Sequence, residues 1–88
     1  MTTIHNKYKE LYDVYIGRPT IFGNPFQMGV DGTRDEVVEK YRKYFEERIQ
    51  TDDDFLQSVV TLKDRKLGCF CKPKSCHGDV ICEFLNSL

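Results

Sequence analysis

The sequence predicts an α/β fold, a small Rossmann-like domain with a short, mainly parallel sheet packed against about three helices. Two observations predict it. Stretches with strand character are separated by stretches with helical periodicity, and the long helical stretches begin with capping residues. Strands separated by helices favour parallel pairing through right-handed crossovers. Residues 1–88 form a single domain, because two halves would each have too small a core to fold alone.

Two short strands are expected near the N-terminus. Residues 2–5 have weak strand character, whereas residues 12–16 alternate polar and apolar side chains and are rich in β-branched and aromatic types. Glycine and proline punctuate residues 17–33, which predicts a long loop. Loops this long in a compact domain tend to be binding loops. Four apolar side chains in it, at Ile21, Phe22, Phe26 and Met28, favour an ordered loop.

The helices have clearer signals than the strands. Thr33 and Glu36 match a capping box, and the apolar residues that follow recur at helical spacing up to Ile49, which predicts an amphipathic helix of about four turns. Residues 51–54 cap a second, shorter helix. A strand is expected at residues 66–71, ended by Pro73, and a last helix from about Cys76 to Asn86.

Two segments are expected to form one site. In parallel sheets, ligands bind beyond the carboxyl ends of the strands. The loop after Ile16 and the Cys-rich loop after Phe70 both begin at such an end. They should therefore face a common crevice.

The cysteines are clustered, since all four lie between residues 69 and 82. One hypothesis is zinc, held by Cys69, Cys71, Cys76 and His77. Neighbouring residues on a helix point about 100° apart, so Cys76 and His77 would not close a tetrahedral site easily. We therefore expect no cofactor, with zinc as the less favoured alternative.

A second hypothesis is an anion site at the start of the last helix. The first-turn amides of a helix are unpaired and carry the positive end of its dipole. Amides there, including that of Gly78, would favour a phosphate or carboxylate. The Cys71 segment and the cations of Lys72 and Lys74 lie just before it and would contribute to ligand binding.

The same helix start could support nucleophilic chemistry. The helix field would acidify the thiol of Cys76, and His77 or Asp79 is close enough to act as acid, base or orienting group. The alternative is structural: cysteines often pack as small apolar residues, which is the preferred interpretation for Cys82.

The first loop contributes its own candidates. Arg18 follows a strand directly and is able to hold a phosphate or carboxylate in a bidentate manner. Asn24 lies between Gly23 and Pro25 and is either a turn residue or an amide that reads a base.

The composition of the chain argues against some classes of binding partner. A net charge of −1 gives no global field to attract nucleic acid or anionic membrane. The longest apolar runs are too short to span a bilayer, and no secretory signal is seen. We therefore expect a cytoplasmic location, in a bacterial or phage-infected host cell, where disulfides are uncommon.

Four motifs together resemble a known family. They are Tyr-Ile-Gly-Arg-Pro at 15–19, Gly-Asn-Pro-Phe at 23–26, Leu-Gly-Cys-Phe-Cys-Lys-Pro at 67–73 and Cys-His-Gly-Asp-Val at 76–80. They are similar, in the same order and over nearly the whole chain, to a small domain-of-unknown-function family, number four-three-two-six, of bacteriophages and bacteria. Members usually have Trp where this chain has Phe70. The resemblance implies an α/β fold with both motif regions in one site, but no established reaction.

The leading functional hypothesis is a domain that binds or processes a phosphate-bearing nucleotide or nucleotide-derived ligand. A phage would use it on host nucleotide metabolism or signalling. Two alternatives stay open: a zinc-stapled protein-interaction module or host-takeover factor, and a Cys/His-dependent hydrolase or transferase. The expected partner is a small anionic ligand; nucleic acid is not expected, and a homodimer is possible for so small a chain.

Overall fold

A parallel sheet of three short strands forms the base of the described part of the chain. The strands are β1 (Thr3–Asn6), β2 (Val14–Tyr15) and β3 (Lys66–Cys69), in the order β1-β3-β2. Leu67 of the central strand lies opposite Ile4 on one side and Val14 on the other. The structure is a computed structural model and describes residues 1–70 and 74–88.

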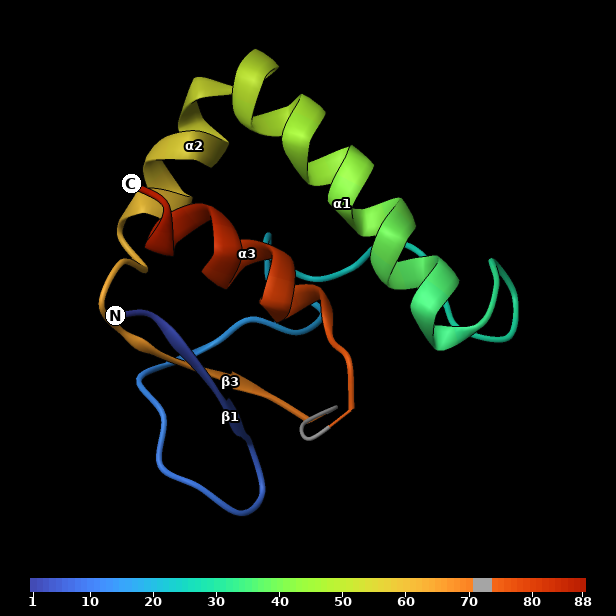
Figure 1. Cartoon of the computed structure of the whole chain (residues 1–88), viewed down its shortest axis with the longest axis horizontal. Coiled ribbons are helices and arrows are strands. Elements are labelled where there is room, and N and C mark those ends of the chain that lie inside the picture. The colour runs from blue at the N-terminus through green and yellow to red at the C-terminus, as the bar shows by residue number, and fades with distance from the viewer. Residues whose placement is uncertain (71–73) are drawn as a thin grey trace.

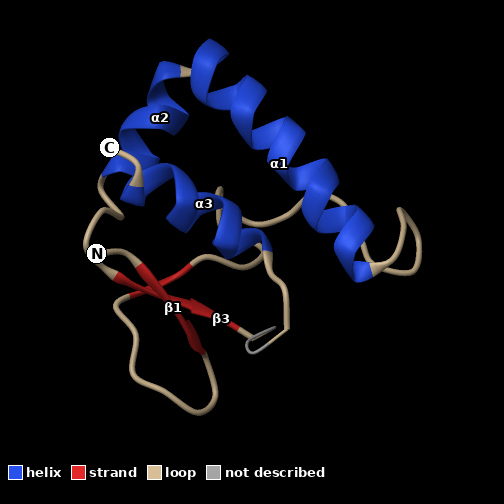
Figure 2. Ribbon diagram, in the orientation of Figure 1, coloured by secondary structure: helices blue, strands red, loops and turns tan. Residues whose placement is uncertain are grey.

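Three helices complete this part of the fold: α1 (Arg34–Thr51), α2 (Asp53–Val60) and α3 (His77–Asn86). Figure 1 shows α3 between α1 and the strands, and α3 contacts both α1 and β1. The three helices lie together on one side of the strands (Figure 2). This arrangement confirms an α/β domain with a small parallel sheet.

The helix starts follow from the capping residues. The Thr33 side chain accepts a hydrogen bond from the Glu36 amide, and the Glu36 carboxylate accepts one from the Thr33 amide. The predicted capping box is therefore confirmed. Asp52 caps α2 by accepting a hydrogen bond from the Phe55 amide at 3.1 Å. Both caps satisfy amides that have no partner within their helix.

The core is one cluster of buried residues from α1, α2, α3 and the sheet side of the fold. Helix α1 buries Val37, Tyr41 and Phe45, which are four residues apart and so share one face. From the sheet side Ile16 and Leu67 are fully buried, and the rings of Phe45 and Phe55 pack edge to face. Among the described residues, no helix combines the length and apolar character needed to cross a bilayer.

The loop at residues 17–33 is ordered by contacts with α1. The Tyr41 hydroxyl donates a buried hydrogen bond of 2.8 Å to the Phe22 carbonyl oxygen. Phe22 is buried as expected and Phe26 is half-buried, but Ile21 and Met28 are more than half exposed. The loop is therefore held by the buried Phe22, by the ring of Phe26, which packs edge to face on Tyr44, and by hydrogen bonds, rather than by four buried apolar side chains.

Candidate functional site

A cavity of about 140 Å³ lies between the ends of β2 and β3 and the starts of α1 and α3. Its walls come from the two segments that the sequence singled out. Gly17 and Arg18 follow β2, and Cys76 and His77 open α3. The structure therefore brings the loop after Ile16 and the segment that opens α3 to one pocket.

Two arginines line this pocket, Arg18 from the first loop and Arg34 from the first turn of α1. Arg34 is half-buried and donates a hydrogen bond of 3.4 Å to the Ser75 carbonyl oxygen. Within residues 1–70 and 74–88, no carboxylate lies within ion-pair distance of either guanidinium. The stem of Arg18 packs on Gly23, where a Cβ would lie only 2.9 Å from Arg18 Cγ.

Several of the side chains that line the pocket are apolar. Phe26 and Met28 come from the long loop, Val37 and Val38 from α1, and Phe70 from the end of β3. Phe70 is about half exposed (52%), so its ring lies at the rim of the pocket. The pocket is thus lined by two cations together with aromatic and aliphatic side chains.

His77 is buried beside the pocket, with 8% of its surface exposed. Its Nε2 lies 2.8 Å from the Ile16 carbonyl oxygen. Since a carbonyl only accepts, Nε2 carries the proton and Nδ1 presents its lone pair to Cys76 Sγ at 3.6 Å. Burial lowers the pKa of His77 below 6.5, and the charge of Arg18 lowers it further. The imidazole is therefore neutral near pH 7.

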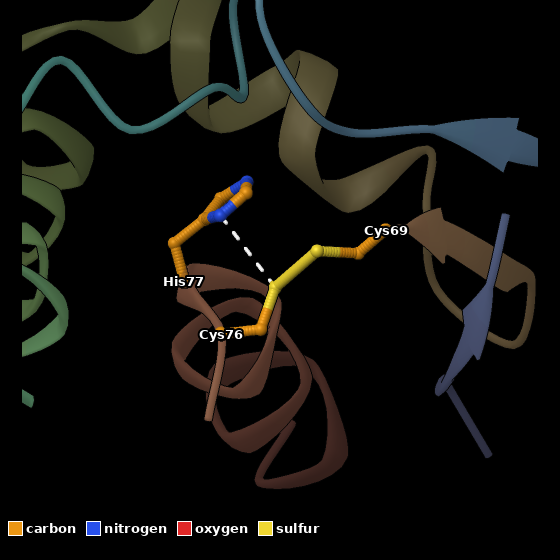
Figure 3. Close-up of side chains that lie close together, drawn as sticks. All are labelled: Cys69, Cys76 and His77. Atoms are coloured by element: carbon orange, nitrogen blue, oxygen red, sulfur yellow. Dashed lines mark hydrogen bonds between the residues drawn. A yellow bond between two sulfur atoms is a disulfide. The ribbon is translucent and has the colours of Figure 1, made fainter. Parts of the chain in front are cut away.

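Cys76 and Cys69 are joined by a disulfide beside His77 (Figure 3). Both cysteines are 1% exposed. The expected nucleophile, a free Cys76 thiolate, is therefore not what this structure contains, because a disulfide sulfur has no thiol to ionise. Nucleophilic chemistry at Cys76 would require the reduced form. The disulfide also departs from the expectation that the cysteines are reduced.

The start of α3 is capped from within. The Gly78 amide donates to Cys76 Sγ at 3.3 Å, and the Cys76 amide donates to the Asp79 carboxylate at 3.2 Å. In this structure the Asp79 carboxylate caps the start of α3, and Asp79 is not among the residues that line the cavity. Its negative charge lies at the N-terminal end of the helix. The free amides expected for an anion are partly used, so arginines are the main anion-binding groups available.

Gly78 is explained by packing. A Cβ at Gly78 would lie 2.6 Å from Ile4 Cδ1 and 2.7 Å from Ile16 Cδ1. These distances are shorter than van der Waals contact, so the glycine lets α3 approach the sheet closely. Its amide donates to Cys76 Sγ, so in this structure the amide already has an acceptor within the fold.

Asn24 lines the pocket, but its amide is used within the fold. Nδ2 donates to the Val37 carbonyl oxygen at 3.1 Å, and Oδ1 accepts from the Phe26 amide at 2.9 Å. Of the two interpretations left open by the sequence, the turn residue is the one that the structure supports. Asn24 ties the long loop to α1.

The remaining candidates lie at the edge of the site or beyond it. Lys74 is exposed and is not among the residues that line the pocket. Cys71 and Lys72, and also Pro73, lie outside the described residues. Cys82 is half-buried and packs against the core, as its position on the inner side of the last helix predicted.

Three side chains have the composition of a metal site. Their ligand atoms, the sulfurs of Cys69 and Cys76 and a ring nitrogen of His77, all lie within 4.8 Å of one another. The geometric objection to a zinc site assumed that Cys76 and His77 are both helical, and this assumption was wrong. Cys76 is not helical: it is an extended N-cap residue with φ −146° and ψ 150°, so its side chain and that of His77 converge.

Arg34 and Phe26 were not identified as site residues from the sequence. Arg34 stands inside the capping motif of α1, and Phe26 stands in a run of loop aromatics. A basic residue at the first position of a helix that follows a binding loop is a weak signal. Only the packing of α1 on α3, with Ser75 accepting from Arg34 and donating to Asp35 Oδ1 at 3.0 Å, shows that α1 contributes to the pocket.

Comparison with known proteins identifies the family. Residues 2–87 match the model of a family described as Domain of unknown function (DUF4326). The chain is 42% identical over 84 residues to the "Uncharacterized 12.4 kDa protein in nrdA-td intergenic region" of Enterobacteria phage T4. This alignment covers 94% of the chain and 76% of the phage protein. No solved structure shows a significant match. The chain belongs to the DUF4326 family, as its four motifs indicated.

Proposed function

We propose that this chain binds a small phosphate-bearing ligand, a nucleotide or a nucleotide-derived molecule, in the pocket between β2, β3, α1 and α3. The observation that carries the proposal is the pair of arginines, Arg18 and Arg34, that line one cavity without a carboxylate partner among residues 1–70 and 74–88. Guanidinium groups bind phosphate and carboxylate through paired hydrogen bonds.

The size and walls of the pocket favour a ligand with a ring next to its anionic group. The volume of this cavity, about 140 Å³, is similar to that of an engineered protein cavity of about 150 Å³ that binds benzene. It therefore holds one ring or a phosphate with part of a sugar, and the rest of a nucleotide would extend over the rim. Phe70 at the rim offers an aromatic face on which a base stacks, as bases do on protein aromatics.

The position of the pocket also supports this proposal. We infer that the fold is a minimal Rossmann-like arrangement, since its strands are parallel and its pocket lies at their carboxyl ends, where α/β proteins bind nucleotides. The similarity to a phage T4 protein fits a role in the cytoplasm of an infected bacterium, on nucleotide metabolism or signalling. Near-zero net charge favours a small ligand over nucleic acid.

The experiment is a thermal-shift screen followed by calorimetry. The panel contains inorganic phosphate, pyrophosphate, ribose 5-phosphate, the common nucleoside mono-, di- and triphosphates, and the unphosphorylated nucleosides. We expect a phosphorylated compound to raise the melting temperature and its unphosphorylated partner to have no effect. Arg18→Ala and Arg34→Ala should each weaken binding of that compound by roughly tenfold or more, the expected loss for a charged hydrogen bond.

Arg65→Ala is the matched control. Arg65 is exposed and precedes β3, at the opposite end of the strand from the pocket. Its removal should leave affinity within about twofold, as for a distant surface charge. The proposal is contradicted if no phosphorylated compound binds, or if all three arginine variants lower affinity equally.

A further inference from the structure

We propose that Cys69, Cys76 and His77, once the disulfide is reduced, form a zinc site on the wall of the pocket. This inference goes beyond the proposed function and does not depend on it. Among the described residues, the ligand atoms of these three buried side chains all lie within 4.8 Å of one another. Two thiolates and one imidazole are ligands that Zn²⁺ prefers.

The interatomic distances suit tetrahedral zinc. With Zn–S near 2.3 Å and Zn–N near 2.0–2.1 Å, a sulfur and a nitrogen on one tetrahedral zinc are about 3.6 Å apart, and two sulfurs about 3.8 Å. Cys76 Sγ and His77 Nδ1 are already 3.6 Å apart. The Cα atoms of Cys69 and Cys76 are 7.6 Å apart, which leaves room for the two sulfurs to separate around a metal.

His77 is oriented as a metal ligand. Its Nε2–H donates to the Ile16 carbonyl oxygen, which fixes the tautomer and directs the Nδ1 lone pair toward the sulfurs. Metal-bound histidines usually donate their other ring N–H to a carbonyl or carboxylate in this way. The ring of His77 also packs edge to face on Tyr41, with ring centres 5.1 Å apart, so it is held in place before any metal binds.

The backbone supports the two sulfur ligands differently. Cys69 ends the central strand, which is paired on both sides. Cys76 is the N-cap of α3, and its sulfur accepts a hydrogen bond from the Gly78 amide. An N–H donor to sulfur stabilises a thiolate, and so does the positive end of the helix.

The described residues supply three ligands to such a metal and leave its fourth coordination position open. All three ligand residues line the pocket, so a metal held by them would contact the cavity that Arg18 and Arg34 also line. Zinc with three protein ligands and one open position is the arrangement of catalytic rather than structural sites. An anion in the pocket or a water molecule would take the fourth position.

Loading the metal requires a reduction step. A dithiol reductant donates two electrons and two protons to the Cys69–Cys76 bond; the S–S bond breaks, two thiols form, and the reductant closes to its own disulfide. Zn²⁺ then displaces both thiol protons to solvent and binds the two thiolates and the neutral imidazole. Oxidised chain and zinc-bound chain are therefore mutually exclusive forms.

The experiment measures metal in the folded, reduced chain. Protein purified with dithiol and added zinc, then exchanged into metal-free buffer, should retain about one Zn²⁺ per chain by native mass spectrometry. Replacement with Co²⁺ should give a thiolate charge-transfer band and the intense visible spectrum of tetrahedral cobalt. X-ray absorption of the zinc form should show two sulfurs near 2.3 Å and a nitrogen near 2.0–2.1 Å.

Matched variants test whether the metal binds at this cluster rather than at Cys82 or His5. Cys76→Ser and His77→Gln should each weaken Co²⁺ binding by at least tenfold and shift the visible spectrum. Cys82→Ser and His5→Gln, which change residues outside the cluster, should leave the affinity and the spectrum unchanged. Circular dichroism checks that each variant is folded.

Metal binding by the wild-type chain tests the proposed zinc site even if Cys76→Ser or His77→Gln unfolds. A reduced, folded wild-type chain that binds neither Zn²⁺ nor Co²⁺ overturns the proposal. A cobalt spectrum without thiolate charge transfer, or binding equally strong in folded His77→Gln, overturns it as well. Metal loss on oxidation with diamide, together with the expected spectra, supports it.

Discussion

The orientation of His77 depends on one hydrogen bond, from its Nε2 to the Ile16 carbonyl oxygen. This contact links the start of α3 to the end of β2, over 61 positions of sequence. The same ring is kept neutral by burial, because burial lowers the pKa of His77. A neutral imidazole whose Nδ1 faces a sulfur is suited to bind a metal or to accept a thiol proton.

Replacing Gly78 by alanine tests how closely α3 packs on the sheet. In Gly78→Ala, the new methyl group would lie 2.6 Å from Ile4 Cδ1 and 2.7 Å from Ile16 Cδ1, so these side chains, or α3 and the sheet, must shift. We expect a loss of roughly 1–3 kcal/mol in the free energy of unfolding, the usual cost of overpacking, reduced by the better helix propensity of alanine. Urea denaturation measures it.

Gln57→Ala is the control for Gly78→Ala, because Gln57 is exposed on α2. It should change the free energy of unfolding by no more than about 0.5 kcal/mol. Equal stability of Gly78→Ala and Gln57→Ala would show that α3 does not pack on the sheet as described.

Tyr41→Phe is the second prediction. The Tyr41 hydroxyl donates to the Phe22 carbonyl oxygen in the core, and burial raises the pKa of Tyr41. Removing the hydroxyl leaves a buried carbonyl without this donor, which should cost about 1–3 kcal/mol of stability. Hydrogen exchange should also increase in residues 17–33, whereas Tyr8→Phe, at an exposed position, should change neither property. Unchanged exchange in the loop would contradict the anchoring role.

At the scale of elements, the helix starts could be predicted because their signals are local. Thr33, Asp52 and the residues after them contain their own hydrogen-bond partners within four positions. The strands were harder to delimit. The expected strand at residues 12–16 is reduced to Val14–Tyr15, because its extent depends on pairing with β3 some 50 residues later. Local sequence contains no such information.

The cap of α2 supports a pH prediction. A hydrogen bond from the Phe55 amide, and then the neighbouring Arg48, lower the pKa of Asp52 below its usual 3.8. Because the folded pKa is depressed, this carboxylate stabilises the fold above pH 3.8. The stabilisation is lost as pH falls through the lower folded value. Wild type should therefore lose stability in acid through this group.

Two variants distinguish the stabilisation by the N-cap hydrogen bond of Asp52 from the stabilisation by its charge. Asp52→Asn keeps a good N-cap but does not titrate, so its denaturation midpoint should fall less steeply with acid than that of wild type. Asp52→Ala loses the cap and should have a lower midpoint already at pH 7. The prediction fails if Asp52→Asn and wild type have the same acid dependence between pH 5 and pH 2.5.

At the scale of the whole molecule, the pocket brings together segments from across the sequence, among them three that carry its charged and hydrogen-bonding groups: Gly17 and Arg18, Arg34, and residues 75–77. The rule that ligands bind at the carboxyl ends of parallel strands correctly joined the first and third segments. The contribution of α1 could not be predicted in this way. It depends on how α1 packs across α3, on the hydrogen bond that Arg34 donates to the Ser75 carbonyl oxygen, and on the one that the Ser75 hydroxyl donates to Asp35.

The Cys69–Cys76 contact was missed for a different reason. Compositional arguments about thiols concern the compartment and the spacing, and they do not show which sulfurs meet. Here the end of the central strand meets the N-cap of α3, so two residues seven positions apart converge beside His77. Sequence reasoning grouped Cys69, Cys76 and His77 as possible zinc ligands and gave Cys76 as a possible nucleophile, but it did not pair Cys69 with Cys76.

The most direct test of the shared pocket is a ¹⁵N–¹H NMR titration of the whole chain with the phosphorylated compound that gives the largest thermal shift. Our account predicts that the amide signals of Gly17, Arg18, Arg34, Ser75 and His77 move together with one dissociation constant, while those of α2 and the loop at residues 61–65 stay fixed. Saturable shifts confined to another face of the molecule, or shifts in only one of the three segments, would contradict it.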